Sequence, residues 1–110
     1  MGGIGRSGQV LATAKAEGRA ALVGYLPVGY PTVAGSLDAF RAICVPGDGP
    51  GVDMVEIGMP YSDPMMDGPV IQRAGTAALN RGVRTRDIFA AVEAVASTGV
   101  VPVCMTYWNI

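Results

Sequence analysis

The chain has 110 residues, of which 50% are hydrophobic and 15% are charged, and its formal net charge is -1. This composition is too apolar for a disordered segment and has no excess of Lys and Arg for binding nucleic acid. No segment approaches the roughly 20 consecutive apolar residues of a membrane-spanning helix, and the N-terminus lacks the apolar run of a signal peptide. We therefore expect a soluble, cytoplasmic domain that binds neither nucleic acid nor a membrane.

The two cysteines, Cys44 and Cys104, are predicted to be buried free thiols in a reducing compartment. Neither lies in a CxxC pair, and the chain has no His to complete a zinc site. The absence of His also excludes Ser–His and Cys–His nucleophiles. Any acid–base chemistry must therefore come from Asp, Glu, Lys, Tyr or Cys.

Short apolar runs alternate with amphipathic segments along the chain. We predict helix, strand, helix, strand, helix, helix and strand, in that order, over residues 9–17, 20–26, 33–44, 54–57, 69–81, 85–97 and 100–105. Gly18 and Gly82 are suited to end two of the helices. Thr32 and Thr85 are suited to begin two others as N-cap residues.

This alternation predicts an α/β fold built from βαβ units around a parallel sheet. The pattern alone does not separate an open doubly wound sheet from part of a (β/α)8 barrel. A complete barrel needs roughly 250 residues, so a sheet of about three strands would be incomplete. Because its edges would be unpaired, we also expect the chain to form a homo-oligomer.

The densest polar cluster follows the second predicted strand. Glu56 interrupts the apolar run of that strand, and Asp63 and Asp67 lie in the loop after it. In parallel α/β proteins, ligands bind beyond the carboxyl ends of the strands. Two carboxylates over one pocket can divide the work there, one moving protons and the other remaining ionised as a hydrogen-bond acceptor.

Two other interpretations of these acids remain open from their spacing. Glu56 can face solvent at the strand end while Asp63 and Asp67 make turn hydrogen bonds. Alternatively, the three acids can bind a divalent metal, although nothing in the spacing fixes a ligand set.

The residues from Glu56 to Gln72, EIGMPYSDPMMDGPVIQ, resemble the signature of the tryptophan synthase alpha subunit. That signature reads roughly E-L/I-G-x-P-F/Y-S-D-P-x-A/M-D-G-P-x-I-Q. Residues 25–31 are similar to the family's first strand and following turn, and residues 105–109 to its third-strand end. The helix over 9–17 is similar to the family's extra N-terminal helix.

The resemblance implies the N-terminal part of a (β/α)8 TIM barrel. Residues 1–110 would form a single partial domain that holds the first three βα units, with about three parallel strands and the third strand at its C-terminus. The barrel would be incomplete, and the extra N-terminal helix would cap it.

The resemblance also implies a reaction, the retro-aldol cleavage of indole-3-glycerol phosphate to indole and glyceraldehyde 3-phosphate in tryptophan biosynthesis. Glu56 matches the family's general acid–base, which acts at the indole ring and at the glycerol hydroxyl. Asp67 matches the carboxylate that accepts a hydrogen bond from the indole N–H and so stabilises positive charge on the ring.

Further positions match residues that the family uses for binding. The substrate-binding positions are Tyr25, where the family usually has Phe, Met105 and Tyr107. Positions that tend to face the beta subunit are Pro60, Asp63 and Asn109. The implied partner is that beta subunit, in a complex of two alpha and two beta subunits. The alpha subunit needs no cofactor and no metal, since the pyridoxal phosphate belongs to the beta subunit.

The main departure from the family is length. The family holds the substrate phosphate with loops late in its barrel, and those loops have no counterpart here. We therefore expect a truncated or proteolytic fragment of the lyase that is inactive or nearly so. The alternatives are a self-associating structural fragment without catalysis, and another phosphate-substrate TIM-barrel enzyme or a small α/β binding module.

Overall fold

The computed structural model describes residues 4–62 and 66–107. In this part of the chain, strands β1 (Val23–Pro27), β2 (Met54–Gly58) and β3 (Val101–Met105) form one parallel sheet in the order β1-β2-β3. The predicted α/β fold with a parallel sheet is confirmed.

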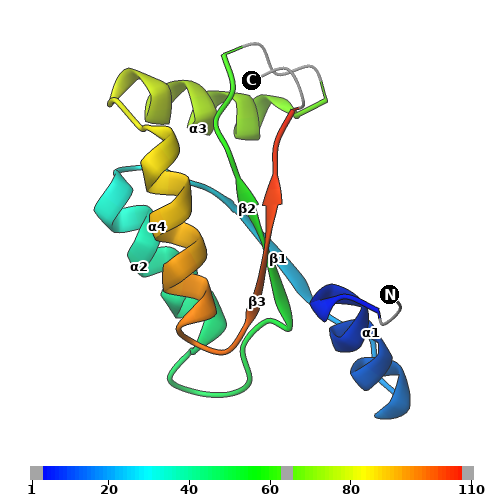
Figure 1. Cartoon of the computed structure of the whole chain (residues 1–110). Helices are drawn as coiled ribbons and strands as arrows, with labels where there is room; N and C mark the ends of the chain where they lie inside the picture. The colour runs from blue at the N-terminus through cyan, green and yellow to red at the C-terminus, as the bar shows by residue number, and fades with distance from the viewer. Residues whose placement is uncertain (1–3, 63–65, 108–110) are drawn as a thin grey trace.

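Four helices accompany the sheet in the described residues: α1 (Arg6–Ala16), α2 (Val33–Cys44), α3 (Pro69–Asn80) and α4 (Thr85–Ala96). Helices α2 and α4 pack against each other on one face of the sheet, as Figure 1 shows. Helix α3 crosses above the carboxyl ends of the strands, and α1 lies near their amino ends, against β3. None of the helices in the described ranges is long and apolar enough to cross a membrane.

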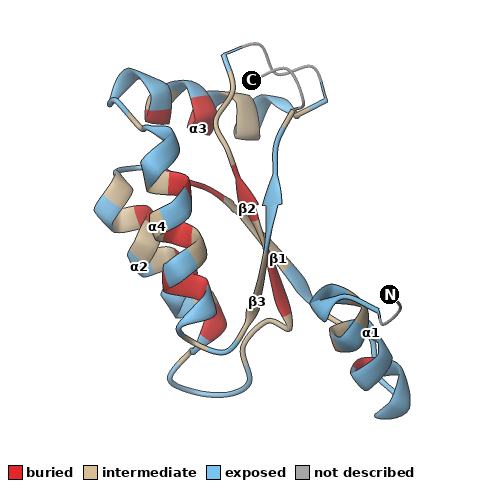
Figure 2. Cartoon of the chain, viewed as in Figure 1, coloured by how far each residue is buried: buried red, intermediate tan, exposed pale blue. Residues whose placement is uncertain are grey.

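The core lies between the sheet and the pair α2 and α4, where the buried residues of Figure 2 gather. Val55 and Ile57 of β2 are fully buried there, packed with Phe40 of α2 and Val95 of α4. Because side chains alternate along a strand, Glu56 must point to the opposite face of the sheet.

That opposite face is largely uncovered in the described part of the chain. Val23 and Val103 are each 39% exposed and Met105 is 48% exposed, although aliphatic residues of central sheets are usually buried. In the described residues, α2 and α4 therefore cover one face of the sheet, and the other face, on which Glu56 lies, is open.

The predicted helix ends are largely confirmed. The side chain of Thr32 accepts a hydrogen bond from the Gly35 N–H at 2.9 Å, which is the expected N-cap of α2. Gly18 and Gly82 follow α1 and α3 with φ of 71° and 88°, a conformation that favours glycine. Both therefore end their helices as predicted.

The predicted starts of α1 and β1 and the predicted N-cap of α4 were wrong, whereas the other predicted bounds agree with the structure within one residue. Helix α1 begins at Arg6 instead of residue 9, and β1 begins at Val23 instead of residue 20, since the chain needs the residues after α1 to reach the sheet. Thr85 is the first residue of α4 and Arg84 is the N-cap, because the Asp87 carboxylate accepts the Arg84 N–H at 2.8 Å.

The prediction for the cysteines was half right. Cys44 is buried in the core, but Cys104 is exposed. Cys104 pairs in register with buried Ile57, yet it belongs to β3, the edge strand of the described sheet. Helix α4 contacts β3, but β3 has no neighbouring strand on its outer side in the described sheet, which leaves Cys104 exposed.

Candidate functional site

The candidate site lies at the carboxyl ends of the three strands, below α3. Backbone hydrogen bonds continue past the strand ends, from the Val28 N–H to the Gly58 carbonyl at 2.9 Å and from the Met59 N–H to the Met105 carbonyl at 3.1 Å. The loop from β2 to α3 starts from this hydrogen-bonded edge.

A cavity of about 480 Å³ opens at this end of the sheet. Its lining is mostly apolar and contains one acid, and it consists of Tyr25, Met59, Met66, Asp67, Gly68, Ile71, Met105, Thr106 and Tyr107. The sequence had selected four of these residues, and the structure brings these four together: Asp67 with Tyr25, Met105 and Tyr107.

Glu56 is not part of this lining, but it lies beside Tyr25. The two residues are direct register partners on neighbouring strands. Glu56 is half-buried and lies on the open face, on the strand that leads to the cavity.

The pKa of the Tyr25 phenol depends on both acids. Burial raises the pKa of the Tyr25 phenol above its ordinary value of 10.0, and the negative charges of Asp67 and then Glu56 raise it further. Both carboxylates therefore act on the same hydroxyl. The Tyr25 ring occupies space over Gly58, where any added Cβ would collide with it, so glycine at 58 makes room for the phenol.

Two residues that sequence reasoning missed hold the loop around Asp67. The Gln72 side-chain amide donates a 2.7 Å hydrogen bond to the Asp67 carbonyl. The Tyr61 ring stacks on Tyr107 with centroids 4.7 Å apart, and the Met66 N–H donates to the Tyr107 hydroxyl at 3.0 Å. Both residues lie within the quoted signature, Tyr61 at its F/Y position and Gln72 at its end, and this is the sequence signal that could have found them.

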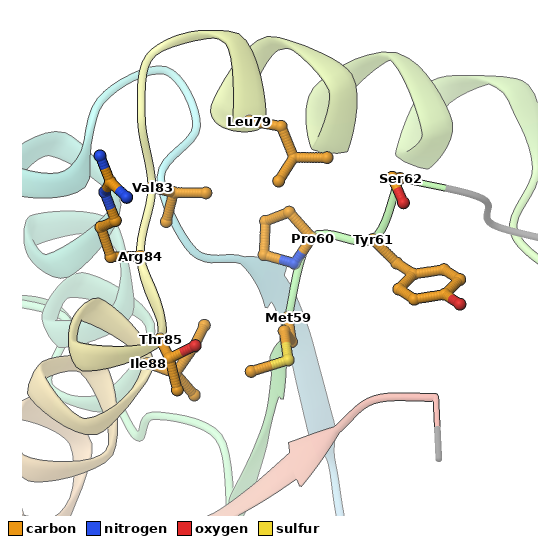
Figure 3. A pocket seen from close by; sticks show the side chains of 9 residues that line it. All are labelled: Met59, Pro60, Tyr61, Ser62, Leu79, Val83, Arg84, Thr85 and Ile88. Atoms are coloured by element: carbon orange, nitrogen blue, oxygen red, sulfur yellow. The ribbon is translucent and has the colours of Figure 1, made fainter. Parts of the chain in front are cut away.

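Pro60, predicted to face a partner subunit, lies in a different hollow of about 310 Å³. Figure 3 shows its ring facing Leu79 and Val83 near the α3–α4 connection. Pro60 does not line the cavity of about 480 Å³, although a smaller pocket is lined by Pro60 together with Tyr25 and Asp67. The other two predicted partner-facing residues, Asp63 and Asn109, lie outside the described residues.

Within residues 4–62 and 66–107, no group of three or more His, Cys, Asp or Glu side chains is placed to bind a metal ion. The three-acid metal site considered from the sequence would include Asp63, which is outside this range. The described residues do form a mostly apolar cavity with Asp67 in its wall, and Glu56 lies on the strand that leads to it.

This arrangement defines a class of protein. A parallel sheet with helices on one face, and acids with a cavity at the carboxyl ends of its strands, is the arrangement of (β/α)-barrel enzymes. The family model described as "Tryptophan synthase alpha chain" matches residues 11–110. The chain belongs to the tryptophan synthase alpha chain family.

Relatives and solved structures agree with this assignment. The chain is 53% identical over 104 residues to the tryptophan synthase alpha chain of Nocardia farcinica, covering 94% of this chain and 38% of that protein. It is 57% identical over 96 residues to that of Salinispora arenicola, covering 87% and 34%. The sheet and helices superpose on tryptophan synthase from M. tuberculosis with a TM-score of 0.90 and 51% identity, covering 97% of this chain and 41% of that one.

The chain thus spans about two fifths of the length of the relatives it matches. It has three parallel strands in its described part, where a (β/α)8 barrel has eight. The fold is therefore a partial barrel, as the sequence predicted, and the uncovered face of its sheet corresponds to the interior of a closed barrel.

Proposed function

We propose that this chain carries the acid–base groups of a lyase site that cleaves indole-3-glycerol phosphate to indole and glyceraldehyde 3-phosphate. Because the chain spans about two fifths of its relatives' length, the activity is proposed for the whole protein, in the cytoplasm and without a cofactor or metal in this subunit. The supporting observation is that Asp67 lines the same cavity as Tyr25, and that Glu56 is the register partner of Tyr25 on the neighbouring strand.

The cavity suits an indole ring. Its walls are apolar on most sides, with Tyr25, Met105 and Tyr107 among them, and Asp67 is the only acid in its described lining. A flat apolar ligand with a single N–H donor matches a pocket of this kind. An ionised Asp67 would accept that N–H in a charge-assisted hydrogen bond.

These positions support the following sequence of steps. Glu56, in its protonated form, delivers a proton to indole C3, and the ring becomes cationic while Asp67 stabilises the charge near nitrogen. The bond between C3 and the glycerol carbon then breaks, and its electron pair returns to the ring. The glycerol hydroxyl gives its proton to the Glu56 carboxylate as the aldehyde forms, so one carboxyl group serves as acid and then as base.

The substrate phosphate needs a site of its own. Among the described residues that line the Asp67 cavity, none is Lys or Arg, the side chains to which phosphate groups usually bind. We propose that the phosphate is bound by other parts of the whole protein, and that the 110-residue chain alone turns over little or no substrate because positioning is lost.

Indole binding tests the assignment of Asp67 in the chain itself. Titration followed by NMR should show indole binding, and D67N should weaken it by about tenfold or more, as expected for a hydrogen bond to a charged group. Indene has the same shape and no N–H, so it serves as the matched ligand and should respond little to D67N. Equal effects on the two ligands would contradict the proposed hydrogen bond.

A second proposal concerns assembly. In the whole protein, we propose that a beta subunit binds at the end of the sheet that carries Pro60. For the chain alone we propose self-association, because the open face exposes Val23, Val103 and Met105 and β3 is an unpaired edge in the described sheet. Light scattering at micromolar concentration tests this, and a stable monomer would rule it out.

A further inference from the structure

The backbone before and after the Asp67 side chain is held by two hydrogen bonds to other side chains. On the side before it, the Met66 N–H donates to the Tyr107 hydroxyl at 3.0 Å. On the side after it, the Gln72 side chain donates to the Asp67 carbonyl at 2.7 Å. The two partners come from different elements, since Tyr107 follows β3 and Gln72 belongs to the first turns of α3.

The contact through Tyr107 is reinforced by its ring. Tyr107 stacks on Tyr61 with an interplanar angle of 26°, so both ends of the β2–α3 loop, at 61 and at 66, touch the same side chain. Next to this stack, the Thr106 hydroxyl lies 3.2 Å from the Met59 sulfur. The end of β3 therefore braces the loop at several points.

The contact through Gln72 is anchored in the helix. The Gln72 N–H donates to the Gly68 carbonyl at 2.9 Å, which closes the first turn of α3. Pro69 begins the helix with a fixed φ. The Gln72 side chain thus reaches back from a regular helix to the residue just before its N-cap, and it is half-buried.

We propose that Tyr107 and Gln72 are positioning residues that together fix the backbone of Asp67 and so aim its carboxylate into the cavity. This rests on the role proposed above for Asp67. A carboxylate on a loop contributes to a reaction only when its geometry is fixed beforehand. The hydrogen bond to Tyr107, which follows β3, and the hydrogen bond from Gln72 of α3 together fix the geometry of Asp67.

The Tyr25 phenol reports the position of Asp67 without any substrate. Replacing Gln72 by Met keeps the side-chain length and removes the donor. Q72M should therefore let Asp67 move away from Tyr25, and the Tyr25 titration should shift toward the value found in D67N. In a D67N background, Q72M should produce no further shift, which separates release of Asp67 from a direct effect of the new side chain.

A second measurement, at neutral pH, tests Tyr107. Y107F keeps the ring and its stack on Tyr61 but removes the acceptor of the Met66 N–H. Solvent exchange of that amide, measured by NMR, should become about five- to tenfold faster. Y61F removes a hydroxyl from the same stack and leaves the Met66–Tyr107 hydrogen bond in place, so it is the matched control and should change the exchange rate little.

Both measurements are made on the chain itself, with circular dichroism confirming that each variant is folded. An unchanged Met66 exchange rate in Y107F together with an unchanged Tyr25 titration in Q72M would overturn the proposal. Indole binding is measured separately: if the two reporters respond as expected but no variant binds indole, the positioning stands and the proposed function fails. In the expected outcome, Q72M and Y107F each weaken indole binding several-fold, less than D67N does.

Discussion

Tyr25 on β1 and Glu56 on β2 are register partners, and their side chains share the open face of the sheet. The phenol is thus placed next to one acid by strand pairing, and the loop after β2 brings the second acid, Asp67, to the same phenol. The titration of the Tyr25 phenol therefore reports on both proposed catalytic groups, and it can be measured without a substrate.

The first prediction concerns the titration of Tyr25. Its pKa should lie above 10.0, because burial and then the charges of Asp67 and Glu56 oppose formation of the phenolate. D67N and E56Q should each lower that pKa, and D67N should lower it more. The measurement is the absorbance of phenolate against pH, with Y25F subtracted to isolate Tyr25. An unchanged titration in both variants would show that neither acid lies near the phenol.

The second prediction concerns the pH dependence of stability at the amino end of the sheet. Asp53 accepts the Leu22 N–H at 2.7 Å and pairs with Arg19 at 3.0 Å. The hydrogen bond from Arg19, and then that from Leu22, hold the pKa of Asp53 below its ordinary value of 3.8. A lowered folded-state pKa gives stability that is present above the unfolded pKa and is lost as the pH falls through the folded value.

D53N should therefore lower the free energy of unfolding at pH 7, and the difference from the unsubstituted chain should shrink below about pH 4. The matched control is D38N, because Asp38 pairs with Arg41 at 3.2 Å with its side chain 81% exposed, and such pairs contribute little. Urea unfolding at several pH values is the measurement. A difference that persists unchanged in acid would assign the effect of D53N to something other than its charge.

The third prediction concerns Gly51, which lies in close contact with the end of α2. A Cβ at this position would lie 2.6 Å from the carbonyl carbon of Cys44 and 2.9 Å from the carbonyl oxygen of Ile43. Because both are backbone atoms, G51A should destabilise the chain by about 1–3 kcal/mol. Gly47 is in the same loop, and a Cβ there would have nothing within 4 Å of it, so G47A should cost less than about 0.5 kcal/mol. Urea unfolding of both variants is the measurement, and equal losses would show that the close approach at 51 is absent in solution.

The fourth prediction compares two phenylalanines. Phe40 is fully buried between α2 and the sheet, whereas Phe89 on α4 is 68% exposed. F40A should lower the free energy of unfolding by about 3–5 kcal/mol, through lost burial and the cavity left behind. F89A should change it by about 0.5 kcal/mol or less. Thermal unfolding followed by circular dichroism measures both, and a large loss in F89A would show that α4 is packed on its outer side.

Much of the fold was predictable because strands and helices carry local signals. The apolar run around Val55 predicted a buried strand, and Thr32 predicted a helix start from its hydroxyl alone. The site was predictable to the extent that its signature is contiguous, and Asp67 does lie in the cavity wall.

What the sequence did not show depends on contacts between distant residues. The hydrogen bond from Met66 to Tyr107 joins residues 41 positions apart, and no local pattern encodes it. The exposure of Cys104 was missed because its residue type favours burial, while its strand is an edge in the described sheet. That Pro60 lines the hollow near the α3–α4 connection likewise depends on contacts between distant residues, and its predicted role at a partner interface stays a prediction.

Turnover in a completed barrel shows whether Glu56 moves the protons. Residues 1–110 would replace the matching segment of the M. tuberculosis protein, to which they are 51% identical with a TM-score of 0.90, and indole release from indole-3-glycerol phosphate would be followed. E56Q should lower kcat by about 10²–10⁴-fold, while the unsubstituted chimera releases indole. Indole release by E56Q within a few-fold of the unsubstituted chimera would contradict the account.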